Sequence, residues 1–391
     1  MATYLGPFCA HVEDAMEEQV NATISHHFSS LKDPRIQLKT RHKLIDIIII
    51  TICAVICGAD DWTEVVDYAK AKHDWLKTFL ELPHGIPSHD TFGRVFSLLQ
   101  PEEFDRCFIN WIHAVFKITE GQTVAIDGKT LRRSHDHASK KAAIHMVGAW
   151  AAQTGLTLGQ VKTEDKSNEI TAIPELLRLL EIKGCIVTID AMGCQKEIAR
   201  QISDQKADYV LALKGNQGNL RKDVELFFEH AQQCQFKDIP HQTYESTDGD
   251  HGRVEVRRYV TVSDLDWLDE KTKWKNLNLI GMVESERHVG DNITRETRYY
   301  ISSLPNDVKR FASAVRDHWT IENQLHWVLD IAFREDDSRV RDRNAAANLS
   351  ILRRFALSLC KQEKTAKVGI KIKRKRAGWN NDYLLTLLRL S

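Results

Sequence analysis

Two aspartates each follow an apolar run that reads as a buried β-strand. Asp127 ends the run "VAID" in "TVAIDGKTL", and Asp190 follows Ile186–Ile189 in "CIVTIDA". Strands buried on both faces read as continuous apolar runs, and the ligands of open α/β sheets bind beyond the carboxyl ends of such strands. If the two strands are neighbours, the two carboxylates converge at one edge of the sheet. The alternative for Asp190 is a structural role as the cap of the helix that follows it.

A pair of neighbouring carboxylates is suited to binding a divalent cation. Like charges raise each other's pKa unless a cation lies between them. Carboxylate oxygens with retained water are what Mg²⁺ or Mn²⁺ prefers, and a pair of aspartates without a cysteine partner argues against zinc. The segment "DGKT" lacks the upstream glycine of a phosphate-binding loop at the required spacing, and no GxSxG or HExxH motif occurs. These absences disfavour a nucleotide-binding loop, a serine hydrolase and a zinc protease.

A third acid is expected on a helix that can lie against this edge, and Glu322 in "RDHWTIENQLHW" is the first candidate. His318 and His326 lie four residues to either side of it and Trp319 three before it, so all four share one helical face. The alternative is that Glu322 pairs with its histidines on the surface. Three acids of "FREDDSRVRDR" rank second because nearby arginines can ion-pair with them: Glu335, Asp336 and Asp337.

Two basic stretches have the residue types that neutralise phosphates. "DGKTLRRS" places Lys129, Arg132 and Arg133 beside the first aspartate, and "HGRVEVRRY" alternates basic and acidic residues along one strand face. The alternative for the second stretch is a charged edge strand that blocks aggregation. The candidate DNA contacts are Lys129, Arg132, Arg133, His251, Arg253, Arg257, Arg316, His318 and His326. In "TEDKSNEIT", structural roles are expected for Glu164, Asp165 and Glu169.

The composition suits a soluble globular protein, and its balanced charge neither indicates nor excludes a nucleic-acid partner. Among 391 residues, 54 Lys and Arg balance 54 Asp and Glu, so any nucleic acid must be met by local patches. Eight cysteines without a CxxC pair give no disulfide framework or zinc site. The N-terminus lacks a secretory signal, and the eleven apolar residues Ile47–Cys57 are too few for a membrane span of about 20. A buried helix, a cytoplasmic location and no membrane partner are expected.

The periodicity predicts a helical start followed by a mixed α/β core. In "GIPSHDTFGRVFSLLQ", Ser88 is an N-cap candidate for either a helix-turn-helix or an ordinary bundle helix. Antiparallel strands with a hairpin at Thr154 and Gly155 precede alternating helices and strands, which is the order of a ribonuclease H-like mixed sheet. Five segments are predicted: a helical N-terminal domain (1–118), the first part of the core (119–215), a β-rich insertion (216–300), a helical completion carrying the Glu (301–360) and a solvated basic tail (361–391).

Taken together, the motifs of the chain resemble those of the H-repeat-associated transposases, a group of DDE transposases of bacterial insertion sequences. The matching segments are "DPR", "AIDGKTLRRS", "KSNEI", "TIDAMGCQ", "YVLALKGNQ", "HGRVEVR" and "HWTIENQLHWVLDIAFREDDSR". Their order and spacing span nearly the whole chain. The resemblance implies a ribonuclease H-like core with the insertion between the second Asp and the Glu. It also implies that Asp127, Asp190 and Glu322 hold two Mg²⁺ or Mn²⁺ ions.

This resemblance also implies metal-dependent cleavage and strand transfer of double-stranded DNA at element ends, into a target DNA. Two ends must be held together, so a homodimer on DNA is expected, with residues 1–118 reading the ends. In related families the Glu helix carries Tyr, Arg and Lys at set offsets, where this chain has Val315, His318 and Leu329. Arg316, His318 and His326 are expected to substitute. The alternatives are a catalytically inactive DNA-binding remnant and a ribonuclease H-like nuclease that cleaves without joining.

Overall fold

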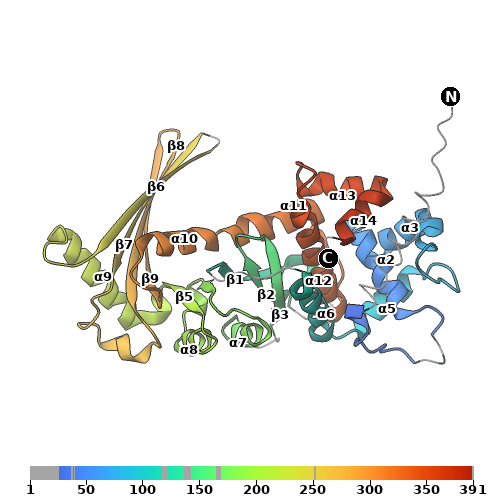
Figure 1. Ribbon diagram of the computed structural model, residues 1–391, viewed down its shortest axis with the longest axis horizontal. Coiled ribbons are helices and arrows are strands. Elements are labelled where there is room, and N and C mark those ends of the chain that lie inside the picture. The colour runs from blue at the N-terminus through green and yellow to red at the C-terminus, as the bar shows by residue number, and fades with distance from the viewer. Residues whose placement is uncertain are drawn as a thin grey trace.

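A nine-stranded mixed sheet runs from one end of an elongated molecule to its middle, and a helical bundle forms the other end (Figure 1). The computed structural model describes residues 26–36, 38, 40–115, 121–135, 142–163, 169–250 and 252–389. In this part of the chain the strand order is β3-β2-β1-β4-β5-β9-β8-β7-β6. The strands are β1 (Thr123–Leu131), β2 (Ile144–Ala151), β3 (Leu156–Lys162), β4 (Ile186–Ile189), β5 (Asp208–Leu213), β6 (Gln242–Asp250), β7 (Arg253–Val262), β8 (Leu279–Val289) and β9 (Asn292–Ser302).

The first five strands have the predicted ribonuclease H-like order. Strands β1, β2 and β3 pair antiparallel, whereas β4 pairs parallel with both β1 and β5. The hairpin between β2 and β3 turns through Gly155, whose φ of 69° lies in the left-handed region that glycine adopts without strain. The apolar residues of β1 and β4 are buried because helices cover both faces of the sheet. Those helices are α7 (Glu169–Leu179) and α8 (Lys196–Asp204) on one face and α10 (Val308–His318) on the other.

The β-rich insertion continues the core sheet instead of forming a sheet of its own. Strand β9 pairs antiparallel with β5, and β8, β7 and β6 follow it outward. Helix α9 (Gly218–Gln233) packs on β9, with the rings of Phe228 and Tyr299 5.9 Å apart. The strand that follows β5 in the sheet therefore comes from the far end of the insertion, and the insertion is attached to the core by main-chain hydrogen bonds.

The N-terminal helices form a bundle with helices from the C-terminal part of the chain. The bundle contains α2 (Leu44–Cys57), α3 (Trp62–Ala71), α4 (His73–Leu76), α5 (His89–Leu98), α6 (Pro101–Val115) and α12 (Arg343–Gln362). Ile47–Cys57 lies within α2 and is buried, as predicted, apart from the half-buried Cys57 at its end. No helix in the described ranges has the length and apolar composition that a membrane span needs. Ser88 caps α5, which packs on α12 as a bundle helix.

The prediction of a solvated basic tail for residues 361–391 is wrong. This stretch includes α13 (Ile370–Trp379) and α14 (Asn381–Arg389), which pack against α2. Lys373 Nζ donates to the Cys360 carbonyl at 2.9 Å, and Arg374 Nη2 donates to the Val55 carbonyl at 2.8 Å. Both carbonyls lie in the last turn of a helix, where few backbone donors remain; Val55 also accepts the N–H of the C-cap Gly58 at 3.3 Å. The charged groups therefore satisfy helix ends while their alkyl stems are buried.

Candidate active site

Asp127 and Asp190 lie side by side in the register of two parallel strands. Ile126 of β1 pairs with Ile189 of β4, so each aspartate is the residue after the last paired position. Strand β1 continues beyond Asp127 because β2 pairs with it there, whereas β4 ends before Asp190. The Asp190 carboxylate accepts the Met192 N–H at 2.9 Å and so caps the short 3₁₀ turn that follows. The capping role considered for Asp190 is therefore present.

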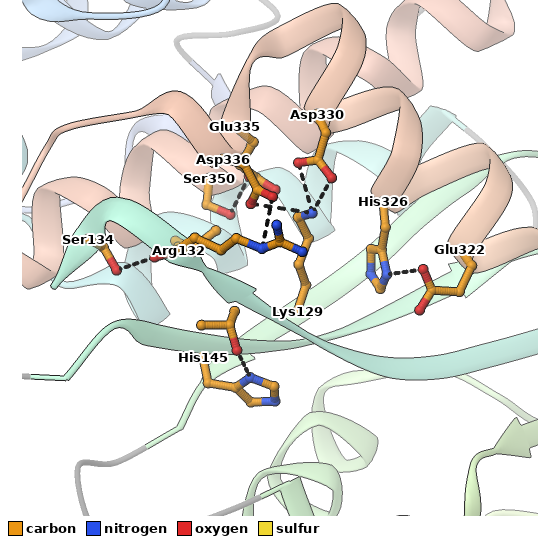
Figure 2. Close-up of polar contacts among 12 residues, drawn as sticks. Lys129, Arg132, Ser134, His145, Glu322, His326, Asp330, Glu335, Asp336 and Ser350 are labelled. Atoms are coloured by element: carbon orange, nitrogen blue, oxygen red, sulfur yellow. Dashed lines mark hydrogen bonds and ion pairs between the residues drawn. The ribbon is translucent and has the colours of Figure 1, made fainter.

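Glu322 reaches the same edge from a π-helical segment, Ile321–His326, that joins α10 to α11 (Trp327–Phe333). The Trp327 N–H donates to the Glu322 carbonyl five residues earlier, which is the π-helical hydrogen bond. Sequence periodicity had indicated one uninterrupted helix here. Ile321 and Leu325 are buried in the core, and Glu322 and His326 point toward the sheet (Figure 2).

His326 bridges the two acids. Its Nδ1 is 3.5 Å from Glu322 Oε2 and 3.6 Å from Asp127 Oδ2. Burial raises the pKa of Asp127, and the Glu322 carboxylate raises it further. The hydrogen bond with His326 lowers the pKa of Glu322. The two carboxylates thus resist ionising together, and a cation between them would relieve this repulsion.

All three predicted acids line one cavity of about 380 Å³. His318, Lys214, Arg298 and Trp319 contribute to the same wall. His318 Nδ1 shares a hydrogen bond with Thr188 Oγ1 at 3.1 Å, and burial lowers the pKa of His318 to about 4. The cavity therefore combines acids from three distant segments with a histidine that is neutral at pH 7.

The competing acids Glu335, Asp336 and Asp337 do not join this cavity. Glu335 is 1% exposed and accepts a hydrogen bond from Arg354 at 2.9 Å. Burial raises the pKa of Glu335, but the positive charges of Arg354, Arg353 and Lys129 together outweigh burial and hold that pKa below its usual range. Asp336 pairs with Arg132 at 3.2 Å, and Asp337 with Arg133 at 3.4 Å. As considered from the sequence, arginines neutralise this acidic cluster.

Three of the candidate DNA contacts follow Asp127 in the chain: Lys129 lies in β1, and Arg132 and Arg133 lie in the 3₁₀ turn after it. Arg132 and Arg133 are exposed, whereas Lys129 is nearly buried and its Nζ lies 2.7 and 2.8 Å from the two Asp330 oxygens (Figure 2). Lys129 is therefore a neutralised charge behind the site. Asp330 was not predicted from the sequence as the partner of Lys129, although it lies four residues after His326 and so on the same helical face.

The predicted basic face of the insertion exists, but its arginines are not equally available. A second cavity of about 380 Å³ is lined by Arg253, Arg257 and Arg316. Arg257 is 8% exposed and pairs with Asp248 and Glu255, both at 2.6 Å, so these acids neutralise its charge, and its contact with DNA stays a prediction. The edge-strand alternative is wrong, because β7 lies between β6 and β8. Three more arginines of this cavity were missed, and only the alternation of β8 and β9 could have indicated them: Arg287, Arg295 and Arg298.

Two predicted histidine contacts face inward. His326 is 6% exposed against Asp127 and Glu322, and His318 is half-buried on Thr188, so neither is placed to meet a DNA backbone outside the cavity. Glu169 pairs with His145 at 2.7 Å in the structural role expected for it. Glu164, Asp165 and His251 lie outside the described residues.

Comparison with known proteins matches two family models to this chain. A family described as DDE_Tnp_1-associated matches residues 25–112, and one described as Transposase DDE domain matches residues 118–359. "Putative transposase YncI" of Escherichia coli is 45% identical over 367 residues, covering 93% of each chain. "H repeat-associated putative transposase YhhI" of Escherichia coli is 41% identical over 370 residues, 93% of this chain and 97% of that protein. "Inactive transposase YbfQ", also of Escherichia coli, is 43% identical over 74 residues, 19% of this chain and 88% of that protein.

Proposed function

We propose that this chain, which belongs to the DDE transposase family, cleaves DNA at the ends of an insertion sequence and joins the freed ends to a target. Asp127, Asp190 and Glu322 would be its metal-binding catalytic residues. The observation that carries the proposal is that these three acids, from strands β1 and β4 and from the π-helical segment, line one cavity. The nuclease alternative shares this cavity and differs only in the absence of joining.

The donor set fits divalent cations that prefer oxygen ligands. The ligand atoms of Asp127, Glu322 and His326 all lie within 4.8 Å of one another, whereas Asp190 lines the same cavity without belonging to this cluster. When bound, two Mg²⁺ or Mn²⁺ ions would activate a water or a DNA 3′-hydroxyl and stabilise the leaving oxygen. Asp127, Asp190 and Glu322 would hold these ions through their carboxylate oxygens. Parallel pairing of β1 with β4 fixes the two aspartates before any ion binds.

DNA would approach along the exposed arginines on either side of this cavity. The acid-lined cavity and the arginine-lined cavity of the insertion share Arg298 and Trp319 as wall residues, so the two are contiguous. On the other side, Arg132 and Arg133 keep 78% and 50% of their side chains exposed. These groups can neutralise phosphates without reading sequence. We propose that residues 1–118 read the element ends, that two copies of the chain hold two ends, and that the protein acts in the cytoplasm.

The test is cleavage of the element's terminal DNA by purified protein in the presence and absence of Mg²⁺ or Mn²⁺. Asp127→Asn preserves shape but removes the charge, and should abolish both cleavage and joining. Asp223→Asn, at an exposed position of α9, is the matched control and should retain both. Cleavage that survives Asp127→Asn, or that needs no divalent ion, would contradict the proposal. Cleavage without joined product would favour the nuclease alternative.

A second candidate function is that of an inactive DNA-binding remnant. Two observations favour it: one relative is named an inactive transposase, and Val315, His318 and Leu329 replace the Tyr, Arg and Lys of related families. A remnant would bind terminal DNA without cutting it. Magnesium titration by calorimetry separates the two functions, because Asp190→Asn should weaken binding only if the carboxylates bind the ion.

A further inference from the structure

We propose that His326 is a direct ligand of one of these ions, and that it gives the site a preference for Mn²⁺ over Mg²⁺. The inference rests on the proposed function, because it concerns the ion that Asp127 and Glu322 would bind. It adds a nitrogen ligand to a site whose expected ligands are all oxygens.

The position of the imidazole carries the inference. His326 is 6% exposed, and its Nδ1 lies 3.5 Å from Glu322 Oε2 and 3.6 Å from Asp127 Oδ2. Ligand atoms bound to one such ion at about 2.1 Å are at most about 4.2 Å apart. The three donor atoms lie within 4.8 Å of one another, so side-chain shifts of a few tenths of an ångström would gather them around one ion. Among the described residues these three form the candidate ion-binding cluster.

The backbone is built to hold this imidazole in place. Ile321–His326 is π-helical, a rare geometry that occurs mostly as single turns and frequently at functional sites. Ile321 and Leu325 anchor the turn in the core with no exposed surface. His326 therefore cannot swing outward without unpacking the turn, which is the rigidity that a metal ligand needs.

The surrounding charges leave room for a cation. Lys129, on the same strand as Asp127, would otherwise compete with the ion. Its Nζ is held by both oxygens of Asp330 at 2.7 and 2.8 Å, and Asp336 lies at 3.8 Å. These two acids account for the ammonium charge, so the charge of Asp127 and Glu322 is left for the ion.

Ligand chemistry then predicts the preference. Carboxylate oxygens accept Mg²⁺ and Mn²⁺ alike, whereas imidazole nitrogen is a ligand for transition ions and a poor one for Mg²⁺. The alternative is that His326 is a positioning residue that only orients Glu322 by a hydrogen bond. In that case its replacement would weaken both ions by the same factor and leave their ratio unchanged. The ratio of affinities therefore separates a ligand from a positioning residue.

The experiment uses the full-length, metal-free protein without DNA. Mn²⁺ binding is measured by electron paramagnetic resonance and Mg²⁺ binding by competition against Mn²⁺. His326→Asn offers an oxygen near the Nδ1 position, so it should keep an ion but reduce the Mn²⁺-to-Mg²⁺ affinity ratio by about tenfold, or 1.4 kcal/mol. His230→Asn, at an exposed position of α9, is the matched control and should leave the ratio unchanged.

A spectroscopic signature makes the test independent of how the variant folds. Wild-type protein with bound Mn²⁺ should show electron spin echo modulation from a directly coordinated nitrogen-14, and His326→Asn should lose it. Bound Mn²⁺ without that modulation, or an unchanged affinity ratio in the variant, overturns the inference. If the modulation persists in His326→Asn and disappears in His318→Asn, the nitrogen ligand is His318, and the inference about His326 is refuted.

Failure of the inference can be told apart from failure of the proposed function. If Asp127→Asn abolishes Mn²⁺ binding while His326→Asn leaves the affinity ratio unchanged, the carboxylate site stands and only the imidazole ligand is lost. If Mn²⁺ binding is indifferent to Asp127→Asn, the proposed metal-dependent function fails as well.

Discussion

Replacing Glu335 by glutamine should lower the free energy of unfolding without abolishing the proposed DNA cleavage. Glu335 is 1% exposed, accepts hydrogen bonds from Arg354 at 2.9 Å and Ser350 at 3.1 Å, and lies in the electrostatic field of Arg353. Both arginines are 2% exposed. Glutamine keeps the shape and one acceptor but leaves buried positive charge without its counter-charge.

The magnitude follows from the burial of the pair. Breaking a buried ion pair by removing one partner costs about 3–5 kcal/mol, because the remaining charge stays desolvated. Since glutamine still accepts one hydrogen bond, we expect Glu335→Gln to lower the free energy of unfolding by about 3 kcal/mol. The comparison variant is Glu322→Gln. The Glu322 side chain is 53% exposed and raises the pKa of Asp127, so its neutralisation should change stability by less than about 1 kcal/mol.

Glu335→Gln should therefore lower the stability and spare DNA cleavage, whereas Glu322→Gln should spare the stability and abolish cleavage. Urea unfolding followed by circular dichroism should show the loss in Glu335→Gln and not in Glu322→Gln. Terminal-DNA cleavage at low temperature, where both variants are folded, should be retained by Glu335→Gln and lost in Glu322→Gln. If Glu335→Gln is as stable as wild type and cannot cleave DNA, Glu335 is the third acid and our assignment of Glu322 is refuted.

Three further predictions concern the fold around the site. Burial raises the pKa of Asp105 from 3.8 to about 7, so between these pH values the folded chain binds a proton that the unfolded chain has released. Stability should therefore fall as the pH rises from about 4 to 7. Asp105→Asn should flatten this slope when unfolding midpoints are measured across that range. Deleting residues 365–391 should give insoluble protein, because it uncovers the buried helix α2, whereas a soluble truncation with unchanged melting would contradict the packing of α13 and α14. Gly128→Ala should lower the unfolding free energy by about 1–3 kcal/mol, since its Cβ would fall 2.1 Å from Glu169 Oε1 and 2.3 Å from His145 Nε2; equal stability in denaturant would show that this pair moves aside freely.

The acid positions could be predicted because they depend on local pattern. The runs before Asp127 and Asp190 are mostly apolar, which predicts buried strands, and parallel neighbours bring the residues at their ends together. Glu322 was recognisable by its histidine neighbours. The π-helical turn that carries it was not, because a single turn with one extra residue leaves no period in the sequence. The sequence could therefore indicate which acid to choose, but not that His326 would bridge it to Asp127.

The burial of three basic residues was not predicted, for one common reason. Arg257, Lys373 and Arg374 were interpreted as solvated or DNA-facing because charged residues are mostly exposed. Each is buried against partners that are distant in the sequence or that lie on another strand: Asp248 for Arg257, and helix-end carbonyls for the other two. One amino-acid sequence does not show which carboxylate or carbonyl will lie next to a given charged side chain in the folded protein.

The unbroken ladder from β4 through β5 to β9 leaves no hinge between the acids and the outer arm of the insertion. The arm is therefore a rigid extension of the core sheet. Strand β8 has 11 residues, which at about 3.3 Å each extend roughly 36 Å. Duplex DNA of about ten base pairs, or one helical turn, has the same length at 3.4 Å per pair. Under the proposed function, with DNA lying along this arm, one residue added to each of β8 and β9 should lengthen the protected flank by about one base pair.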